Sequence, residues 1–211
     1  MESTAASSAS PVRRRKIPDH LVKEEIDGIK FYYRGFKQVL NKTKSLQDIM
    51  GCSSLQSFLV EYVLTLFIEG GAQKRYRVFT NESGNHLALH NNLQFDIALY
   101  DKKLLTADKI TRRYVQSIPP HLVIEVDIDV ELEDTGLQSM EEFVLLKTGK
   151  LIEFGTQKVI WILSKSKKVV VAEAGKTWTI HDWNEDLDLL DDIRFNIGKH
   201  LIDEGVNPEM V

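Results

Sequence analysis

The run Val159–Leu163 limits how this chain can fold more than any other feature, because every residue in it is apolar. Successive side chains of a strand point to opposite faces of a sheet, so such a strand is buried on both faces and needs helices over each. Two helices are predicted: one from Ser53 or Ser54 to Gly70-Gly71, and one from about Leu137 to Phe154, closed by Gly155. The pattern predicts an α/β (α+β) fold, with a mixed central sheet flanked by helices.

The remaining elements follow from short apolar runs and turn residues. Strands are expected at Ile29–Tyr33, Tyr76–Thr80, His86–His90, Phe95–Tyr100 and Leu122–Ile128, and a terminal hairpin at Val169–Ala172 and Trp178–Ile180. Further helices are expected before Pro119 and over Asp191–Glu204. Residues 1–16 are expected to be a disordered arm ending in four cations, either a solvated tail or a phosphate contact, and residues 17–211 a single domain.

Composition narrows the functional classes. The net charge of −4 and pI near 5.9 argue against a protein that coats nucleic acid by charge alone, but a carboxylate cluster that holds a metal would itself be acidic. No apolar run has the roughly 18–20 residues of a membrane span. The single cysteine, Cys52, cannot form an internal disulfide, so a cytoplasmic location is the expectation.

The predicted strand Phe95–Tyr100 carries one carboxylate. Alternation places Phe95, Ile97 and Leu99 on one face, and Asp96 on the other with Ala98 and Tyr100. A carboxylate in an apolar strand must reach water, a partner or a metal, so Asp96 is either a solvent-facing residue or a site residue.

The segment His121–Asp129 repeats this pattern with more charge. Leu122, Ile124, Val126 and Ile128 share one face, and Val123, Glu125, Asp127 and Asp129 share the other. Like charges on one strand face repel unless a cation lies between them or solvent screens them. Glu125 is therefore a candidate metal ligand or part of an exposed sheet face.

The helix after Gly136 carries a lysine among apolar residues. On a helical wheel Met140, Phe143, Val144, Leu151 and Phe154 cluster, and Lys147 lies in the middle of that cluster. A buried ammonium needs a carboxylate or phosphate unless it extends back to water. Lys147 is thus a candidate site residue, Lys150 at the edge of the cluster is the alternative, and a broken helix at Gly149 would remove the argument.

At this point the chain resembles a known family. Asp96 in its strand, then Pro119–Val126, a lysine-bearing helix, Gly155 and Val159–Leu163 are similar to the Uma-type family of candidate restriction endonucleases in the PD-(D/E)XK superfamily. The resemblance covers roughly Ile17 to the C-terminus and is strongest from Asn91 to Leu163. It implies a restriction-endonuclease-like fold and hydrolysis of phosphodiester bonds in DNA.

The resemblance also assigns roles. Asp96, Glu125 and the Val126 carbonyl would bind Mg²⁺ or Mn²⁺, and Lys147 would orient or activate a water. The superfamily lysine normally follows the Glu by two residues, where this chain has Asp127, so Lys147 fits members whose lysine has moved to the next helix. Asp127 could add a ligand or impair catalysis, and Glu61 or Glu82 could add an acid. Lys109, Arg112 and Arg113 could contact the DNA backbone.

Three functions remain open at this stage. The first is a metal-dependent nuclease, for which a homodimer would let two sites cut two strands. The second is a catalytically inactive nuclease-fold module for binding or interaction. The third is a structural protein whose carboxylates are merely exposed.

Overall fold

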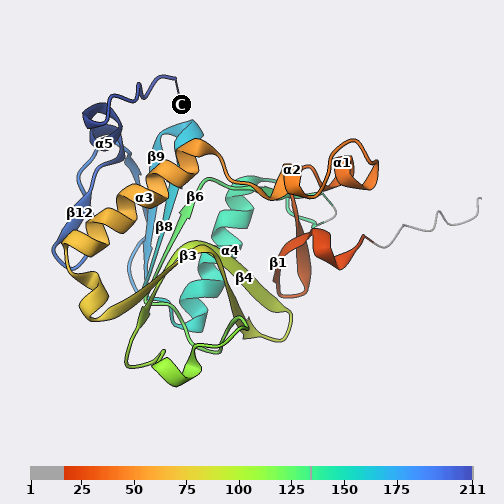
Figure 1. Ribbon diagram of the computed structural model, residues 1–211, viewed down its shortest axis with the longest axis horizontal. Helices are drawn as coiled ribbons and strands as arrows, with labels where there is room; N and C mark the ends of the chain where they lie inside the picture. The colour runs from red at the N-terminus through yellow and green to blue at the C-terminus, as the bar shows by residue number, and fades with distance from the viewer. Residues whose placement is uncertain (1–16, 134, 211) are drawn as a thin grey trace, which may run out of the picture.

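The computed structural model describes residues 17–133 and 135–210, and places them in five α-helices and two sheets (Figure 1). The strands are β1 (Val22–Ile26), β2 (Ile29–Tyr33), β3 (Tyr76–Ala88), β4 (Asn91–Asp101), β5 (Val115–Gln116), β6 (Leu122–Val126), β7 (Val130–Glu131), β8 (Lys158–Leu163), β9 (Lys168–Glu173), β10 (Thr179–Asp182), β11 (Leu187–Leu190) and β12 (Ile193–Phe195). The helices are α1 (Phe36–Leu40), α2 (Gln47–Met50), α3 (Ser54–Glu69), α4 (Met140–Phe154) and α5 (Ile197–Asp203). The expected basic arm lies outside the described residues.

The main sheet is mixed. In the described ranges it has ten strands, in the order β10-β9-β8-β6-β4-β1-β2-β7, with β3 paired to β4 and β5 paired to β3. The central pair β6 and β8 is parallel, and α4 connects the two strands, whereas β4 runs antiparallel to β6. Because β8 lies inside the sheet and is covered on both faces, its apolar sequence is accounted for.

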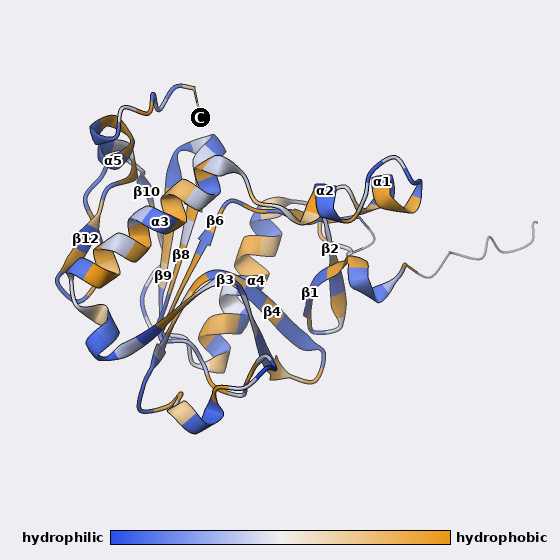
Figure 2. Cartoon of the chain, in the orientation of Figure 1, coloured by the Kyte–Doolittle hydropathy of each residue, from blue (hydrophilic) through white to orange (hydrophobic). Residues whose placement is uncertain are grey.

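The two long helices cover opposite faces of the sheet (Figure 1). One core contains apolar residues of α3 and α5 together with Ile97, Ile124 and Ile160 of the central strands. The other contains residues of α4 together with Val123 and Trp161. The colouring by hydropathy shows apolar stretches along β8 and on α4 (Figure 2). The expected three-layer arrangement is thus present.

Helix α3 begins and ends where the sequence predicts, whereas α4 begins at Met140 instead of the predicted Leu137 and ends as predicted at Phe154. The Ser53 hydroxyl accepts a hydrogen bond from the Gln56 amide at the start of α3, and Ser139 does the same for Glu142 at the start of α4. Gly155 ends α4 with φ of 116°, a backbone conformation in which a side chain would be strained. These caps fix the position of α4 along the sheet.

Several predicted elements are wrong. The predicted strands Tyr76–Thr80 and His86–His90 are parts of one strand, β3, which ends at Ala88, so Leu89 and His90 lie in the turn before β4. The two parts are continuous because Asn81 and Glu82 form a bulge with positive φ instead of a turn. The segment before Pro119 has only a single 3₁₀ turn, since its apolar residues do not gather on one buried face. The predicted helix over Asp191–Glu204 begins only at Ile197, because β12 occupies the residues before it.

In the described part of the chain, no helix combines the length and apolar character that a membrane crossing demands.

Candidate active site

The site lies where the two strands along one edge of β4, which are β1 and β6, separate from each other. Along one edge, β4 pairs with β1 at Asn92 and with β6 from Ile97 onward, opposite Ile124. Between those positions the strands diverge, so backbone groups of β4 need partners other than a strand. Gln94 and Asp96 lie in this gap. On β6, Ile124 is the last residue that pairs with β4, and Glu125 follows it directly, so Glu125 also lies at the gap. The topology of the sheet therefore brings Asp96 and Glu125 to one place.

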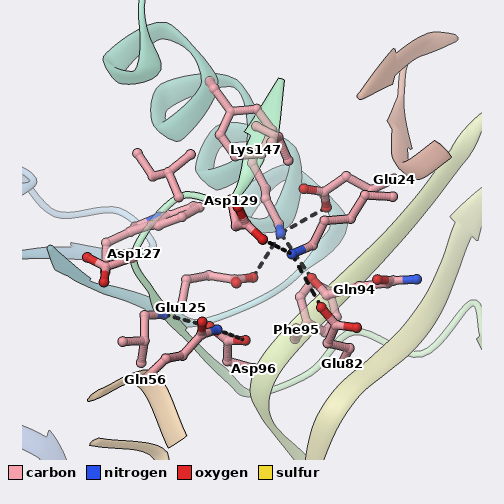
Figure 3. Close-up of a pocket in the computed structure, with 16 residues that line it drawn as sticks. Glu24, Gln56, Glu82, Gln94, Phe95, Asp96, Glu125, Asp127, Asp129 and Lys147 are labelled. Atoms are coloured by element: carbon pink, nitrogen blue, oxygen red, sulfur yellow. Dashed lines mark hydrogen bonds and ion pairs between the residues drawn. The ribbon is translucent and has the colours of Figure 1, made fainter. Parts of the chain in front are cut away.

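Lys147 of α4 reaches into the gap. Its ammonium contacts the carboxylates of Glu24 at 2.8 Å and Glu125 at 2.9 Å, and donates to the Gln94 carbonyl at 2.9 Å (Figure 3). The ammonium is thus engaged by two ion pairs and one hydrogen bond. The Gln94 carbonyl, left without a strand partner, is thereby satisfied. The lysine ties together β1, β4, β6 and α4.

Lys147 and the two carboxylates that it contacts, those of Glu24 and Glu125, are deeply buried. Only 3% of Lys147, 3% of Glu24 and 6% of Glu125 is exposed. Three aromatic rings surround the ammonium, with centroids 5.6 Å (Phe95), 5.9 Å (Phe143) and 5.7 Å (Trp161) away. Aromatic faces attract a cation, and together with the two carboxylates they offset the loss of its hydration.

Burial shifts the acid–base behaviour of both acids. It raises the pKa of Glu125 to about 8; Lys147 opposes this shift, while Asp96 and Glu24 add to it. Burial also raises the pKa of Asp96, against its hydrogen bond from Val126 and the charge of Lys147. Burial by itself would lower the pKa of Lys147, but Glu125 and Glu24 together raise it. The lysine is therefore charged, and the site disfavours full ionisation of its acids in the absence of a further cation.

Asp96 is held in place through both carboxylate oxygens. One accepts from the Gln56 side chain at 2.8 Å, and the other from the Val126 amide at 2.7 Å (Figure 3). Gln56 lies in the first turn of α3, where its own amide donates to Ser53 at 3.0 Å. The helix cap on one face of the sheet thus orients a carboxylate of the site.

The strand pattern around Asp96 departs from the prediction at Phe95. Ile97 and Leu99 pack in the core on the α3 side, but Phe95 packs with Phe143 on the α4 side, together with Ala98 and Tyr100. The prediction that Phe95 shares a face with Ile97 and Leu99 is wrong. The bulge in β3 between Thr80 and Ser83 lies opposite this position and interrupts regular alternation.

Asp127 does not share the face of Glu125, contrary to the predicted alternation. Strand β6 ends at Val126, and Asp127 has a φ of 60°, outside the strand conformation. Its carboxylate accepts from the amide and the hydroxyl of Ser164, each at 2.7 Å. Asp127 therefore ties the end of β6 to the end of β8, although it also borders the cavity that contains the site.

The other candidates are dispersed. Lys150 pairs with Asp27 and Glu153, each at 3.0 Å, and not with Glu125. Glu82 borders the site cavity, whereas Glu61 lines a neighbouring groove. The cations Lys109, Arg112 and Arg113 are exposed on the segment before β5 and border neither space.

Sequence reasoning missed two charged residues of β1, Glu24 and Lys23. Glu24 is buried against Lys147, and the Lys23 ammonium lies 3.3 Å from Glu82 and 3.8 Å from Asp129. A signal was available: Asp27-Gly28 predicts a turn, and the segment before it, Val22–Ile26, pairs with β2. Glu24 lies two residues before Ile26, so its carboxylate shares a strand face with that buried residue. Like Asp96, it must therefore reach water, a partner or a metal.

The donor chemistry of Asp96 and Glu125 suits Mg²⁺. Among the described residues, no group of three or more His, Cys, Asp or Glu side chains is arranged to hold a metal ion. Mg²⁺ is commonly bound through one or two carboxylates and keeps several waters, so two acids suffice. A cation beside two buried acids with raised pKa values would favour their ionised forms. The Val126 carbonyl as a further ligand stays a prediction.

Comparison with known proteins supports the fold. No family model matches the chain, and no curated protein matches it. A solved structure from Anabaena variabilis ATCC 29413, described as a candidate nuclease of DUF820, the Uma-type family, is similar, with a TM-score of 0.59 and 16% identity. The match covers 85% of this chain and 89% of the other. The predicted mixed sheet, flanked by helices as in restriction-endonuclease-like folds, is confirmed.

Proposed function

We propose that the chain is a metal-dependent nuclease that hydrolyses phosphodiester bonds of DNA. The observation that carries this proposal is the convergence of Asp96, Glu125 and a buried Lys147 where the strands diverge. The solved structure that shares the fold is itself described as a candidate nuclease, which agrees with the proposal.

The proposed roles follow from the contacts. Asp96 and Glu125 would hold Mg²⁺ or Mn²⁺, Asp96 being oriented for this by Gln56 and the Val126 amide. When bound, the ion would polarise the scissile phosphate and lower the pKa of a water. Lys147 orients Glu125 and balances its charge. Because two carboxylates and a carbonyl already surround its ammonium, a direct contact between Lys147 and a water would have to compete with these partners.

The test is nicking of supercoiled plasmid by the full chain in Mn²⁺ or Mg²⁺. We expect nicked circles that EDTA prevents, and a rate reduced about 10²- to 10³-fold in Asp96→Asn, because a metal ligand contributes several kcal/mol to the transition state. Asp101→Asn, the same change at the end of the same strand, is the matched control, since Asp101 does not border the site cavity.

The result also separates the alternatives. Metal binding without cleavage of DNA or RNA would contradict the nuclease and favour an inactive nuclease-fold module. Metal binding that Asp96→Asn leaves unchanged would contradict the assigned site.

A further inference from the structure

A second cleft adjoins the site. It has a volume of about 330 Å³, and two residues of β1, Lys23 and Glu24, line both spaces. Tyr114 and Asn92 line its other side. The volume falls in the range of roughly 300–1,000 Å³ that small-molecule sites occupy. A group bound in this cleft would therefore lie next to the proposed metal site.

Tyr114 offers the cleft an aromatic surface. Its side chain is 48% exposed, and it is the one aromatic residue among the exposed large hydrophobic residues of the described chain. The ring is seated against Gly84 of β3, where a Cβ would lie 2.5 Å from its Cδ1 atom. Backbone thus supports the ring, and any side chain at position 84 would displace it. A supported, half-exposed ring is suited to stacking with another flat group.

Lys23 supplies a positive charge at the boundary of the two spaces. Its ammonium is 3.3 Å from Glu82 and 3.8 Å from Asp129, both only partly buried. It also lies 5.7 Å from the centroid of the Tyr33 ring. The Lys23 side chain is 14% exposed and its two partners are 36% exposed, whereas the partners of Lys147 are almost fully buried, so an incoming anion can compete for Lys23 more easily than for Lys147.

Charge differs on the two sides of the site. The groove beyond Asp96, of about 970 Å³, is lined by Glu61 and Glu82 and by no lysine or arginine. Near Tyr114 in the sequence, Arg112 and Arg113 are exposed, and neither forms an ion pair within the part of the chain that the structure describes. The cleft itself is lined by two lysines, Lys23 and Lys30, together with Asp19, Glu24 and Glu25, so the cations that an anion can meet lie on the Tyr114 side of the site and not on the Asp96 side.

We infer that this cleft binds one nucleoside of a single-stranded nucleic acid, with its base stacked on Tyr114 and the adjoining phosphate contacted by Lys23. The inference rests on the proposed function and names the form of its substrate. Bases in a duplex are stacked on one another, whereas those of a single strand are free to stack on an aromatic side chain. A chain with a net charge of −4 and two lysines in this cleft is also better matched to the single backbone of one strand than to the two of a duplex.

The experiment measures binding, separately from cleavage. A fluorescein-labelled twelve-residue oligo(dT) and a duplex of equal length are titrated with the full chain in EDTA, and anisotropy gives each dissociation constant. We expect tighter binding of the single strand. Tyr114→Ala should weaken it about 5- to 100-fold, the loss typical of one base–aromatic stack, and Tyr114→Phe should retain it. Ile110→Ala, on the same segment and equally exposed at 48%, should bind like the wild type.

Lys23→Gln provides an independent reading. If Lys23 contacts a phosphate, the slope of log affinity against log salt should become shallower by about 0.7, the value per contact on a single strand. An unchanged slope, equal effects of Tyr114→Ala and Ile110→Ala, or equal binding of duplex and single strand would overturn the inference. Plasmid nicking together with any of these results would leave the proposed nuclease standing. Absence of both nicking and oligonucleotide binding would contradict both.

Discussion

Replacing Lys147 with methionine should lower the free energy of unfolding by about 3–5 kcal/mol, the cost of removing one partner from a buried ion pair. Methionine fills much of the same volume, but Glu24 and Glu125 would remain buried at 3% and 6% exposure without their cation. Urea denaturation monitored by circular dichroism measures the loss. Plasmid nicking should be lost in the same variant, measured at a temperature where it is folded.

Lys150→Met is the matched control, three residues further along α4. Its partners Asp27 and Glu153 are 49% and 74% exposed, so this change should cost about 0–1 kcal/mol. The loss in free energy of unfolding that Lys147→Met causes should also be smaller at pH 5 than at pH 8. Burial holds the folded pKa of Glu125 above its unfolded value, and without the lysine nothing opposes this shift, so the contribution of Glu125 to stability is lost as the pH rises. A variant as stable as the wild type at pH 8 would refute the assigned role.

Metal affinity should depend steeply on pH, because Glu125 has a pKa of about 8, raised first of all by burial. Below that pH its carboxyl group is protonated in the metal-free protein, and a metal ion must displace the proton. Between pH 8 and pH 6 the affinity for Mn²⁺ should fall about 50-fold in total, approaching tenfold per unit below pH 7, and it should level off above pH 8. Calorimetry in buffers of different ionisation enthalpy should detect about one proton released per ion at pH 6.5.

Two variants sharpen this measurement. Glu125→Gln should bind the ion far more weakly and without the steep pH dependence, since the titrating ligand is absent. Glu153→Gln, an exposed acid on the same helix as Lys147, should behave as the wild type. An affinity that does not change between pH 6 and pH 8 would show that Glu125 is not a ligand with a raised pKa.

The parts of the fold that the sequence predicts well are those governed by local periodicity. The two long helices have serine caps, apolar stripes and glycine ends, and the central strands β6 and β8 are runs of apolar residues. Lys147 could be singled out because a helical wheel shows directly that it shares a face with Phe143, Val144 and Leu151. Each of these properties is encoded within a few residues.

The parts that the sequence does not predict depend on distant neighbours. Glu24 faces Lys147 only because the β1–β2 hairpin packs beside β4, with an irregular register between Val22 and Glu24. Phe95 changes face because of a bulge in the adjacent strand β3. Asp127 leaves the strand through a left-handed conformation, for which Ser164 supplies the partner. No pattern within one segment specifies these arrangements.

The central claim is that Asp96 and Glu125 jointly bind one divalent ion beside Lys147. Crystals soaked in Mn²⁺ and measured at the manganese absorption edge test it most directly, because anomalous scattering locates the ion itself. We predict one strong peak within coordination distance of an oxygen from each acid. A strong peak elsewhere in the molecule, with none between these two carboxylates, would contradict the account.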